Sequence, residues 1–411
     1  MLYALGIVLF ALCILGSIAW HECGHMWAAQ ATGMRVRRYF VGFGPTLWST
    51  RRNGIEYGVK ALPLGGFCDI AGMTLLDELN TPEEQQKAMY KQAPWRRVFV
   101  LFAGPAMNFI LGGILIYAVA VVWGLPNLDA APRATVAGTQ CVTASTTKPA
   151  PDASGQLASH AVGPCEGSPA AKAGLQAGDV ITAVDGVGVD ANSLTGALQH
   201  TTGEIRLTIE RGGASRTVTV DPVTAQKWQP TPDGKDYRSV TGPTIGITVG
   251  AIGVVSHYNP FTAVGGAAVF SGQIGEQTVV AIGHLPQKVP ELVRAVEGKP
   301  RALDTPQSVY GAAETGGQIA AHHEWSAFVL VLAGLNLMLG LVNLVPLLPF
   351  DGGHIAVVLY EKVRDVITRR KGAPVDYMKL APATYVVFAV LGAYMLLVLA
   401  ADIVNPIKLF N

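Results

Sequence analysis

The chain has little charge and no excess of either sign. Asp, Glu, Lys and Arg make up 14% of its 411 residues, hydrophobic residues make up 50%, and the formal net charge is +1. So low a charged fraction is unusual for a soluble domain and suits a membrane protein that carries a folded soluble part. The lack of a basic surplus argues against a nucleic-acid partner.

The features of a cleavable signal peptide are also missing. Residues 2–20 are uncharged, with no basic segment before them and no small-residue cleavage site after them. As a helix rising about 1.5 Å per residue, this segment crosses roughly 30 Å of hydrocarbon. We therefore expect it to be retained as a transmembrane helix.

Three more uncharged segments are long enough to span a bilayer, namely 98–123, 325–350 and 380–401. Residues 31–97 hold ten Lys or Arg and residues 361–379 hold six, whereas the 201 residues of 124–324 hold only thirteen. Basic residues flank the cytoplasmic ends of transmembrane helices. The pattern predicts a multi-pass protein of the cell (plasma or inner) membrane, with both termini and the long segment 124–324 outside.

A metal-binding pattern directly follows the first span. His21-Glu22-Cys23-Gly24-His25 places two imidazoles one helical turn apart on one face, with Glu22 beside them. Such residues are costly at membrane depth unless they pair or bind an ion. We interpret His21 and His25 as Zn²⁺ ligands and Glu22 as the general base of a metalloprotease. Coincidence is the alternative, and the position at the end of an apolar span argues against it.

A catalytic zinc ion needs a third protein ligand. The downstream His that serves as third ligand in many soluble proteases is absent, because Ala28 and Ala31 stand where the Gly and the His of that motif would be. Asp351, which closes the uncharged run 325–350, is the candidate; a helix cap at the membrane surface is the other interpretation. The predicted topology runs spans one and three in the same direction, which puts His25 and Asp351 at one depth.

The long outer segment contains a pattern of its own. Glycines at turns beside short β-branched runs in residues 167–189 predict a small sheet with one or two helices. Ala173-Gly174-Leu175 and Gly178-Asp179 resemble the PDZ domains of bacterial proteases, which implies an α+β domain that binds an extended peptide. A plug that only limits access is the alternative. Residues 261–308 predict amphipathic helices on the outer surface rather than a fifth span.

Two of the five cysteines lie on the predicted outer side. Cys141 and Cys165 are therefore a disulfide candidate. Cys13, Cys23 and Cys68 are expected to be free thiols. On the inner side, residues 54–57 and 58–67 predict a short hairpin that returns toward the membrane and includes Gly65 and Gly66.

Together these motifs resemble the site-2 proteases, a family of intramembrane zinc metalloproteases, and most of all its actinobacterial members. The resemblance is carried by residues 21–25, by Phe102 to Asn108, and by Asn343 through Pro346 to Asp351-Gly352. It implies that His21, His25 and Asp351 bind zinc, that Glu22 is the base, and that Asn343 contacts the substrate backbone or the oxyanion. Pro349 comes one residue later than in many relatives, and Phe350 replaces a common Leu.

The resemblance also implies substrates and partners. The inner hairpin with Gly65 and Gly66 would extend a single-pass transmembrane substrate as a strand, although an interfacial hairpin with no substrate role is the alternative. Substrates would be anti-sigma factors already cut by an upstream site-1 protease. Two other functions stay open: clearance of remnant signal peptides by the same chemistry, and a non-catalytic membrane scaffold using the PDZ-like module.

The predicted fold is an α-helical polytopic membrane protein with four transmembrane helices, a membrane-associated β-hairpin and an extracytoplasmic PDZ-like α+β domain. Its predicted parts are a first span with the zinc motif (1–30), an inner segment with the hairpin (31–97), a second span (98–123) and the PDZ-like domain (124–225). An outer region with amphipathic helices (226–324), a third span with the third zinc ligand (325–354), an inner loop (355–379) and a fourth span with the tail (380–411) follow.

Overall fold

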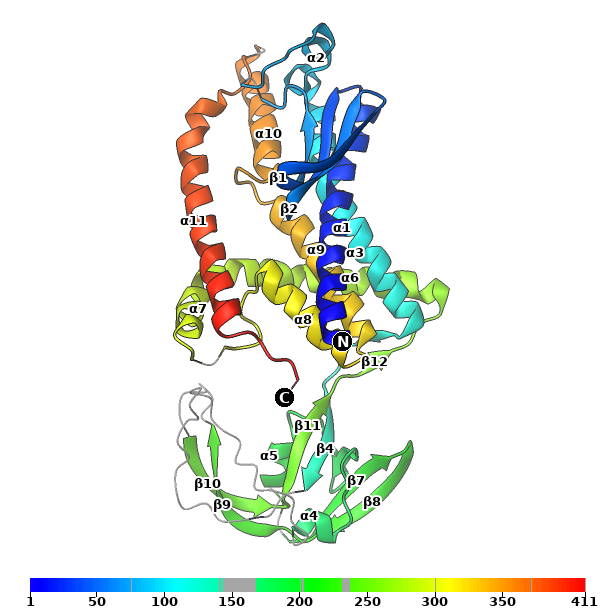
Figure 1. Cartoon of the computed structure of the whole chain (residues 1–411). Helices are drawn as coiled ribbons and strands as arrows, with labels where there is room; N and C mark the ends of the chain where they lie inside the picture. The colour runs from blue at the N-terminus through cyan, green and yellow to red at the C-terminus, as the bar shows by residue number, and fades with distance from the viewer. Residues whose placement is uncertain are drawn as a thin grey trace. The chain divides into compact units, whose positions relative to one another are not determined.

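The computed structural model divides the chain into two compact units (Figure 1). One, the helical unit, consists of residues 1–123 and 258–411, and the other, the sheet unit, of residues 124–257. The described residues are 1–74, 76–139, 142, 168–199, 201, 203–230, 237–299, 301–370 and 372–410. The predicted disulfide partners Cys141 and Cys165 lie outside them.

Four helices in the described part of the chain are long and apolar enough to cross a membrane: α1 (Leu2–Ala31), α3 (Pro94–Val122), α9 (Trp325–Asn343) and α11 (Tyr377–Val404). The chain is therefore a polytopic membrane protein, and each of the four predicted spans corresponds to a candidate spanning helix. Helices α1, α3 and α9 pack side by side (Figure 1). Helix α1 continues through the His21–His25 motif without a break.

The part predicted to hold the third span, 325–354, is not one helix. Helix α9 ends at Asn343, and α10 (Asp351–Thr368) begins after seven intervening residues, so it also fills much of the predicted loop 355–379. Pro346 and Pro349 lie in the break because a proline has no N–H to continue a helix. A side chain at Gly352 or Gly353 would collide with the backbone of residues 344–348, so the glycines let α10 start against this break.

The hairpin formed by β1 (Val36–Arg52) and β2 (Ile55–Ile70) is longer than the predicted residues 54–67. The two strands join through Asn53-Gly54, where both residues have positive φ, so the turn is not at residues 57–58. An Asn-Gly pair is the preferred two-residue hairpin turn. The hairpin folds back on itself: Tyr39 pairs with both Tyr57 and Cys68. Its bends fall where glycines adopt positive φ, at Gly42, Gly44 and Gly65.

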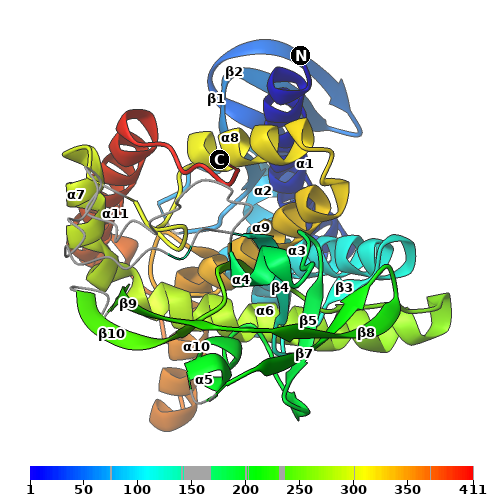
Figure 2. The same cartoon turned by 90° about the horizontal axis from the view of Figure 1, so that it is seen from below.

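Shorter helices complete the helical unit: α2 (Pro82–Lys87), η1 (Met89–Lys91), α6 (Pro260–His284), η2 (Leu285–Lys288), α7 (Val289–Val296) and α8 (Val309–Ala321). Figures 1 and 2 show α6 lying crosswise to α3 and α9, which it contacts. It is not among the candidate spans in the described part of the chain. Helix α8 packs on α1, where Gly316 admits the ring of Phe10. Leu292 of α7 packs in one cluster with Val398 of α11.

Two buried ion pairs join elements that are far apart in sequence. Arg97 at the start of α3 donates to Glu361 of α10 at 2.6 Å, and Glu361 also accepts from the backbone N–H of Val375. Near the other end of α11, Arg301 lies 2.6 Å from Asp402, with both side chains 1% exposed. Removing one partner of a buried pair is strongly destabilising. These pairs therefore fix α10 and α11.

The sheet unit has an α+β architecture. Its main sheet has the strand order β11-β4-β5-β7-β8, and β6 pairs with β5. The strands are β4 (Arg133–Thr139), β5 (Val180–Val184), β6 (Val187–Gly188), β7 (Ile205–Arg211), β8 (Ala214–Val220) and β11 (Ile247–Ile252). Helices α4 (Pro169–Lys172) and α5 (Leu194–Gln199) flank it, and the core gathers Val136, Ile181, Leu194, Leu207 and Ile209.

Two small ladders accompany the main sheet. Strands β9 (Val223–Pro230) and β10 (Tyr237–Thr244) form an antiparallel pair. Strands β3 (Leu125–Pro126) and β12 (Val255–Ser256) pair with each other. The second pair brings the two ends of the sheet unit together.

Candidate metal centre

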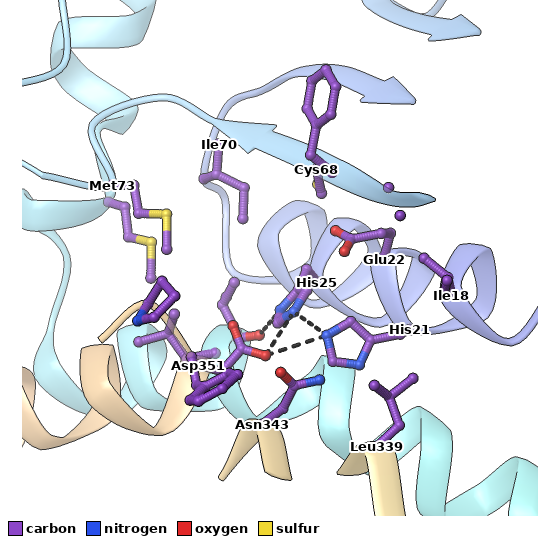
Figure 3. A pocket seen from close by; sticks show the side chains of 18 of the residues that line it. Ile18, His21, Glu22, His25, Cys68, Ile70, Met73, Leu339, Asn343 and Asp351 are labelled. Atoms are coloured by element: carbon purple, nitrogen blue, oxygen red, sulfur yellow. Dashed lines mark hydrogen bonds and ion pairs between the residues drawn. The ribbon is translucent and has the colours of Figure 1, made fainter. Parts of the chain in front are cut away.

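Three side chains from two helices meet at one point of the helical unit. His21 and His25 lie one turn apart on α1 and are both 7% exposed, and Asp351 is the first residue of α10. Figure 3 shows the two imidazoles and the carboxylate pointing toward one another. Because α9 ends before residue 351, the chain can turn and present Asp351 to α1. The three residues predicted as ligands are thus brought together.

The spacing of their polar atoms suits a tetrahedral metal ion. Nε2 of His21 lies 3.1 Å from Nε2 of His25, and both nitrogens lie 3.3 Å from Oδ2 of Asp351. Ligands about 2.0–2.1 Å from a tetrahedral ion are about 3.3 Å apart. Two imidazoles and a carboxylate are a common donor set for zinc.

The other ring nitrogen of His25 contacts α3. Nδ1 of His25 donates to the backbone carbonyl of Val100 at 2.8 Å. A carbonyl oxygen only accepts, so the proton of the neutral ring lies on Nδ1 and Nε2 keeps its lone pair for a metal. This contact could not be predicted from the sequence, because every residue has a backbone carbonyl whatever its side chain.

His21 contacts α3 through a side chain. Its Nδ1 lies 2.9 Å from the amide nitrogen of Asn108, and the amide oxygen of Asn108 is buried without a partner among the described residues. Between the two contacts on α3 lies Gly104. A Cβ there would come within 2.7 Å of Nε2 of His21 and still closer to Nε2 of His25. The lack of a side chain at residue 104 leaves the space in which an ion would bind.

Glu22 lies beside the two histidines, between α1 and β2 (Figure 3). Cys68 of β2 lines the same cavity as Glu22. A Cβ at Gly66 would lie 3.2 Å from Cγ of Glu22 and 3.3 Å from Ile18. The glycine therefore allows β2 to run close to α1 at the predicted base.

A cavity of about 690 Å³ opens at this point. Its lining includes the predicted site residues His21, Glu22, His25, Gly65, Gly66, Asn343 and Asp351. Figure 3 shows the amide of Asn343 next to Asp351 and His21, and Met73 on the side of Asp351 that faces away from His21. Residue patterns did not indicate the apolar part of the wall, which adds Ile70, Met73, Met89, Val100 and Leu101.

Other polar side chains and thiols of the helical unit have different roles. Cys13, Cys23 and Cys68 are free thiols, as predicted. Burial raises the pKa of the Cys68 thiol, which makes it a poor metal ligand. His354 lies 3.1 Å from the hydroxyl of Tyr377, and burial lowers its pKa. Asn336 of α9 donates to Ser17 of α1 at 3.0 Å and so links two candidate spans.

Comparison with known proteins identifies relatives along the whole chain. The family model "Peptidase family M50" matches residues 9–386. The zinc metalloprotease Rip1 of Mycobacterium bovis is 48% identical over 416 residues and that of Mycolicibacterium smegmatis is 49% identical over 428 residues, in both cases covering 100% of each chain. The regulator of sigma-E protease RseP of Salmonella typhimurium is 26% identical, covering 91% of this chain and 92% of RseP.

These matches agree with the geometry of the site and confirm the resemblance predicted from the motifs. The chain belongs to peptidase family M50, the family of the site-2 proteases.

Proposed function

We propose that the chain is an intramembrane zinc endopeptidase in which His21, His25 and Asp351 hold the ion and Glu22 is the general base. The observation that carries the proposal is the placement of three ligand atoms 3.1–3.3 Å apart, two of them on a helix apolar enough to span a membrane. The names of the Rip1 relatives, zinc metalloproteases, support zinc as the ion.

The residues around the ion have complementary tasks. When bound, zinc supplies a Lewis acid that polarises a peptide carbonyl and activates water. Glu22, beside both histidines, takes the proton of the attacking water and passes it to the leaving amine. Asn343 offers an amide at the same cavity, where it donates to the substrate backbone or to the developing oxyanion.

The substrate is proposed to be a single-pass transmembrane protein that enters the cavity in extended form. A helical peptide bond is shielded by its own turn, and the strand β2, with Gly65 and Gly66 lining the cavity, offers a backbone edge on which a peptide can extend. Anti-sigma factors, cut beforehand by a site-1 protease, are the proposed class. The similarity to the regulator of sigma-E protease RseP supports this choice.

The sheet unit is proposed to be a PDZ-like domain outside the cell membrane, where it binds or filters incoming proteins. Its α+β sheet around Gly174 and Gly178 supports the assignment. The surplus of Lys and Arg in residues 31–97 and 361–379 supports an orientation with both termini outside. To test this orientation, a single cysteine is placed at either terminus of the chain, and cells with an intact membrane are treated with an impermeant thiol reagent. Protection of these cysteines from the reagent would contradict the orientation.

The test of the enzyme compares the native chain with Glu22→Gln and Asp351→Ala in detergent. Cleavage of a truncated single-pass peptide is followed by mass spectrometry, and zinc content by elemental analysis. We expect Glu22→Gln to bind zinc normally but to cleave about 10²–10⁴-fold more slowly. Asp351→Ala should lose both zinc and cleavage. Undiminished cleavage by Glu22→Gln would show that the site is not a protease of this kind.

A further inference from the structure

We propose that Asn108 is a positioning residue that accepts a hydrogen bond from Nδ1–H of His21 and thereby leaves Nε2 of His21 free for the metal. The proposal rests on the zinc site proposed above. Asn108 lies in the middle of α3, is fully buried, and contacts the ring of His21 at 2.9 Å.

The positions of the ring atoms determine which nitrogen must carry the proton. Nε2 of His21 faces Nε2 of His25 at 3.1 Å and Oδ2 of Asp351 at 3.3 Å, so Nε2 is the atom directed at the ion. A nitrogen that ligates a metal uses its lone pair and carries no proton. In the neutral ring the proton is then on Nδ1, which needs an acceptor.

Asn108 can supply that acceptor. The amide nitrogen lies next to Nδ1, while the amide oxygen is buried and has no partner. A half turn of the amide exchanges the two atoms, and the two ends of an amide are told apart only by their hydrogen-bond partners. The oxygen then receives the Nδ1 proton. The end of Asn108 without a partner is thus the end that a metal-bound His21 requires.

The contact of His25 with the same helix supports this orientation. Nδ1 of His25 donates to the carbonyl of Val100, which can only accept. Val100, Gly104 and Asn108 follow one another at intervals of four residues and so lie along one face of α3. This face offers an acceptor to each histidine, and between them a glycine makes room for both Nε2 atoms. A partner that fixes the second ring nitrogen is the usual support of a metal-bound histidine.

The test measures zinc affinity of the full chain in detergent by competition with a chelator. Asn108→Leu removes the amide at similar size and should weaken zinc binding about 10–100-fold. Asn108→Asp keeps an acceptor and removes the donor, so it should bind zinc as tightly as the native chain. If Asn108 acted as a donor instead, the Asp variant would be as weak as the Leu variant, and the proposal would be wrong.

A matched control separates this effect from general loss of a buried amide. Asn336 is also a buried Asn of a spanning helix, 1% exposed, and it bonds to Ser17 without touching a ligand. Asn336→Leu should keep native zinc affinity. Zinc loss in Asn336→Leu equal to that in Asn108→Leu would overturn the specific role of Asn108.

A second measurement reports the geometry of the site directly. With Co²⁺ in place of zinc, the visible absorption bands should be the same in the native chain and Asn108→Asp and should shift in Asn108→Leu, because the His21 ring is no longer held. Identical spectra and affinities in all three would overturn the proposal. Failure of the zinc site itself looks different: the native chain would bind no zinc, or would bind it equally after His21→Ala.

Discussion

At the scale of single residues, the site depends on the lack of a side chain at Gly104 as much as on its three predicted ligands. The two histidines were recognisable from their spacing, because a one-turn interval places both rings on one face. Gly104 carries no chemistry and was recognisable only as part of a motif. Its importance comes from packing: α3 can approach the Nε2 atoms of His21 and His25 only if no side chain projects from residue 104.

Gly104→Ala is therefore expected to abolish zinc binding, although alanine is the better helix former. Its Cβ would occupy the space between the two Nε2 atoms. Gly113, on the same helix, is the matched control, because a Cβ there meets nothing within 4 Å. Gly113→Ala should keep full zinc content. Elemental analysis of both purified variants decides; normal zinc in Gly104→Ala would mean that the histidines move apart without penalty.

At the scale of elements, the sequence was informative wherever one pattern ran through one element. The four apolar runs predicted the spans α1, α3, α9 and α11 because hydropathy over some twenty residues is a strong signal. The break between Asn343 and Asp351 was less legible. The prolines indicated a disturbance, but only the packing of Gly352 and Gly353 against residues 344–348 turns it into the start of a new helix.

The hairpin of β1 and β2 shows the same limit. Asn53-Gly54 is a strong turn signal that was available in the sequence, and it would have placed the turn correctly. The pairing of β1 with both halves of β2 could not be predicted from the sequence, because it depends on bends at glycines and on contacts between distant residues. The roles of Gly65, Gly66 and Asn343 remain predictions.

The ion pair between α3 and α10 is expected to hold Asp351 in place. Glu361→Ala leaves Arg97 buried without its partner and should lower the free energy of unfolding by about 3–5 kcal/mol. Glu83→Ala, which breaks the exposed ion pairs of Glu83 with Lys87 and Arg35, should change the free energy of unfolding far less. Denaturant unfolding in mixed micelles, followed by circular dichroism, compares them. Equal losses in both variants would contradict a supporting role for the buried pair.

At the scale of the whole molecule, the helical unit and the sheet unit have separate cores and separate stabilising contacts. In the sheet unit, Arg211 donates to both carboxylate oxygens of Asp179 at 2.6 Å, and Asp179 is 1% exposed. These hydrogen bonds hold the pKa of Asp179 below its ordinary value. The Gly178-Asp179 pair, noticed first as part of a PDZ-like pattern, thus also has a structural task.

The lowered pKa predicts how the stability of the sheet unit depends on pH. The ionised carboxylate is favoured in the folded unit, so its stabilisation is present above about pH 4 and is lost as pH falls through the lowered pKa. Native protein should therefore be more stable than Asp179→Asn at pH 7, and the difference should shrink in acid. Hydrogen exchange of peptides from residues 174–211, corrected for the intrinsic effect of pH, measures it. A difference that grows in acid would contradict the sign.

The short ladder between β3 and β12 bears on how such a protein can be rebuilt. Leu125 pairs with Ser256, and Pro126 with Val255, so the chain enters the sheet unit and leaves it at adjacent positions. The segment between β3 and β12 is thereby inserted between two neighbouring, paired strands. Another domain, or a two-residue turn, could be grafted between these two strands, and the chain would still run continuously from α3 to α6.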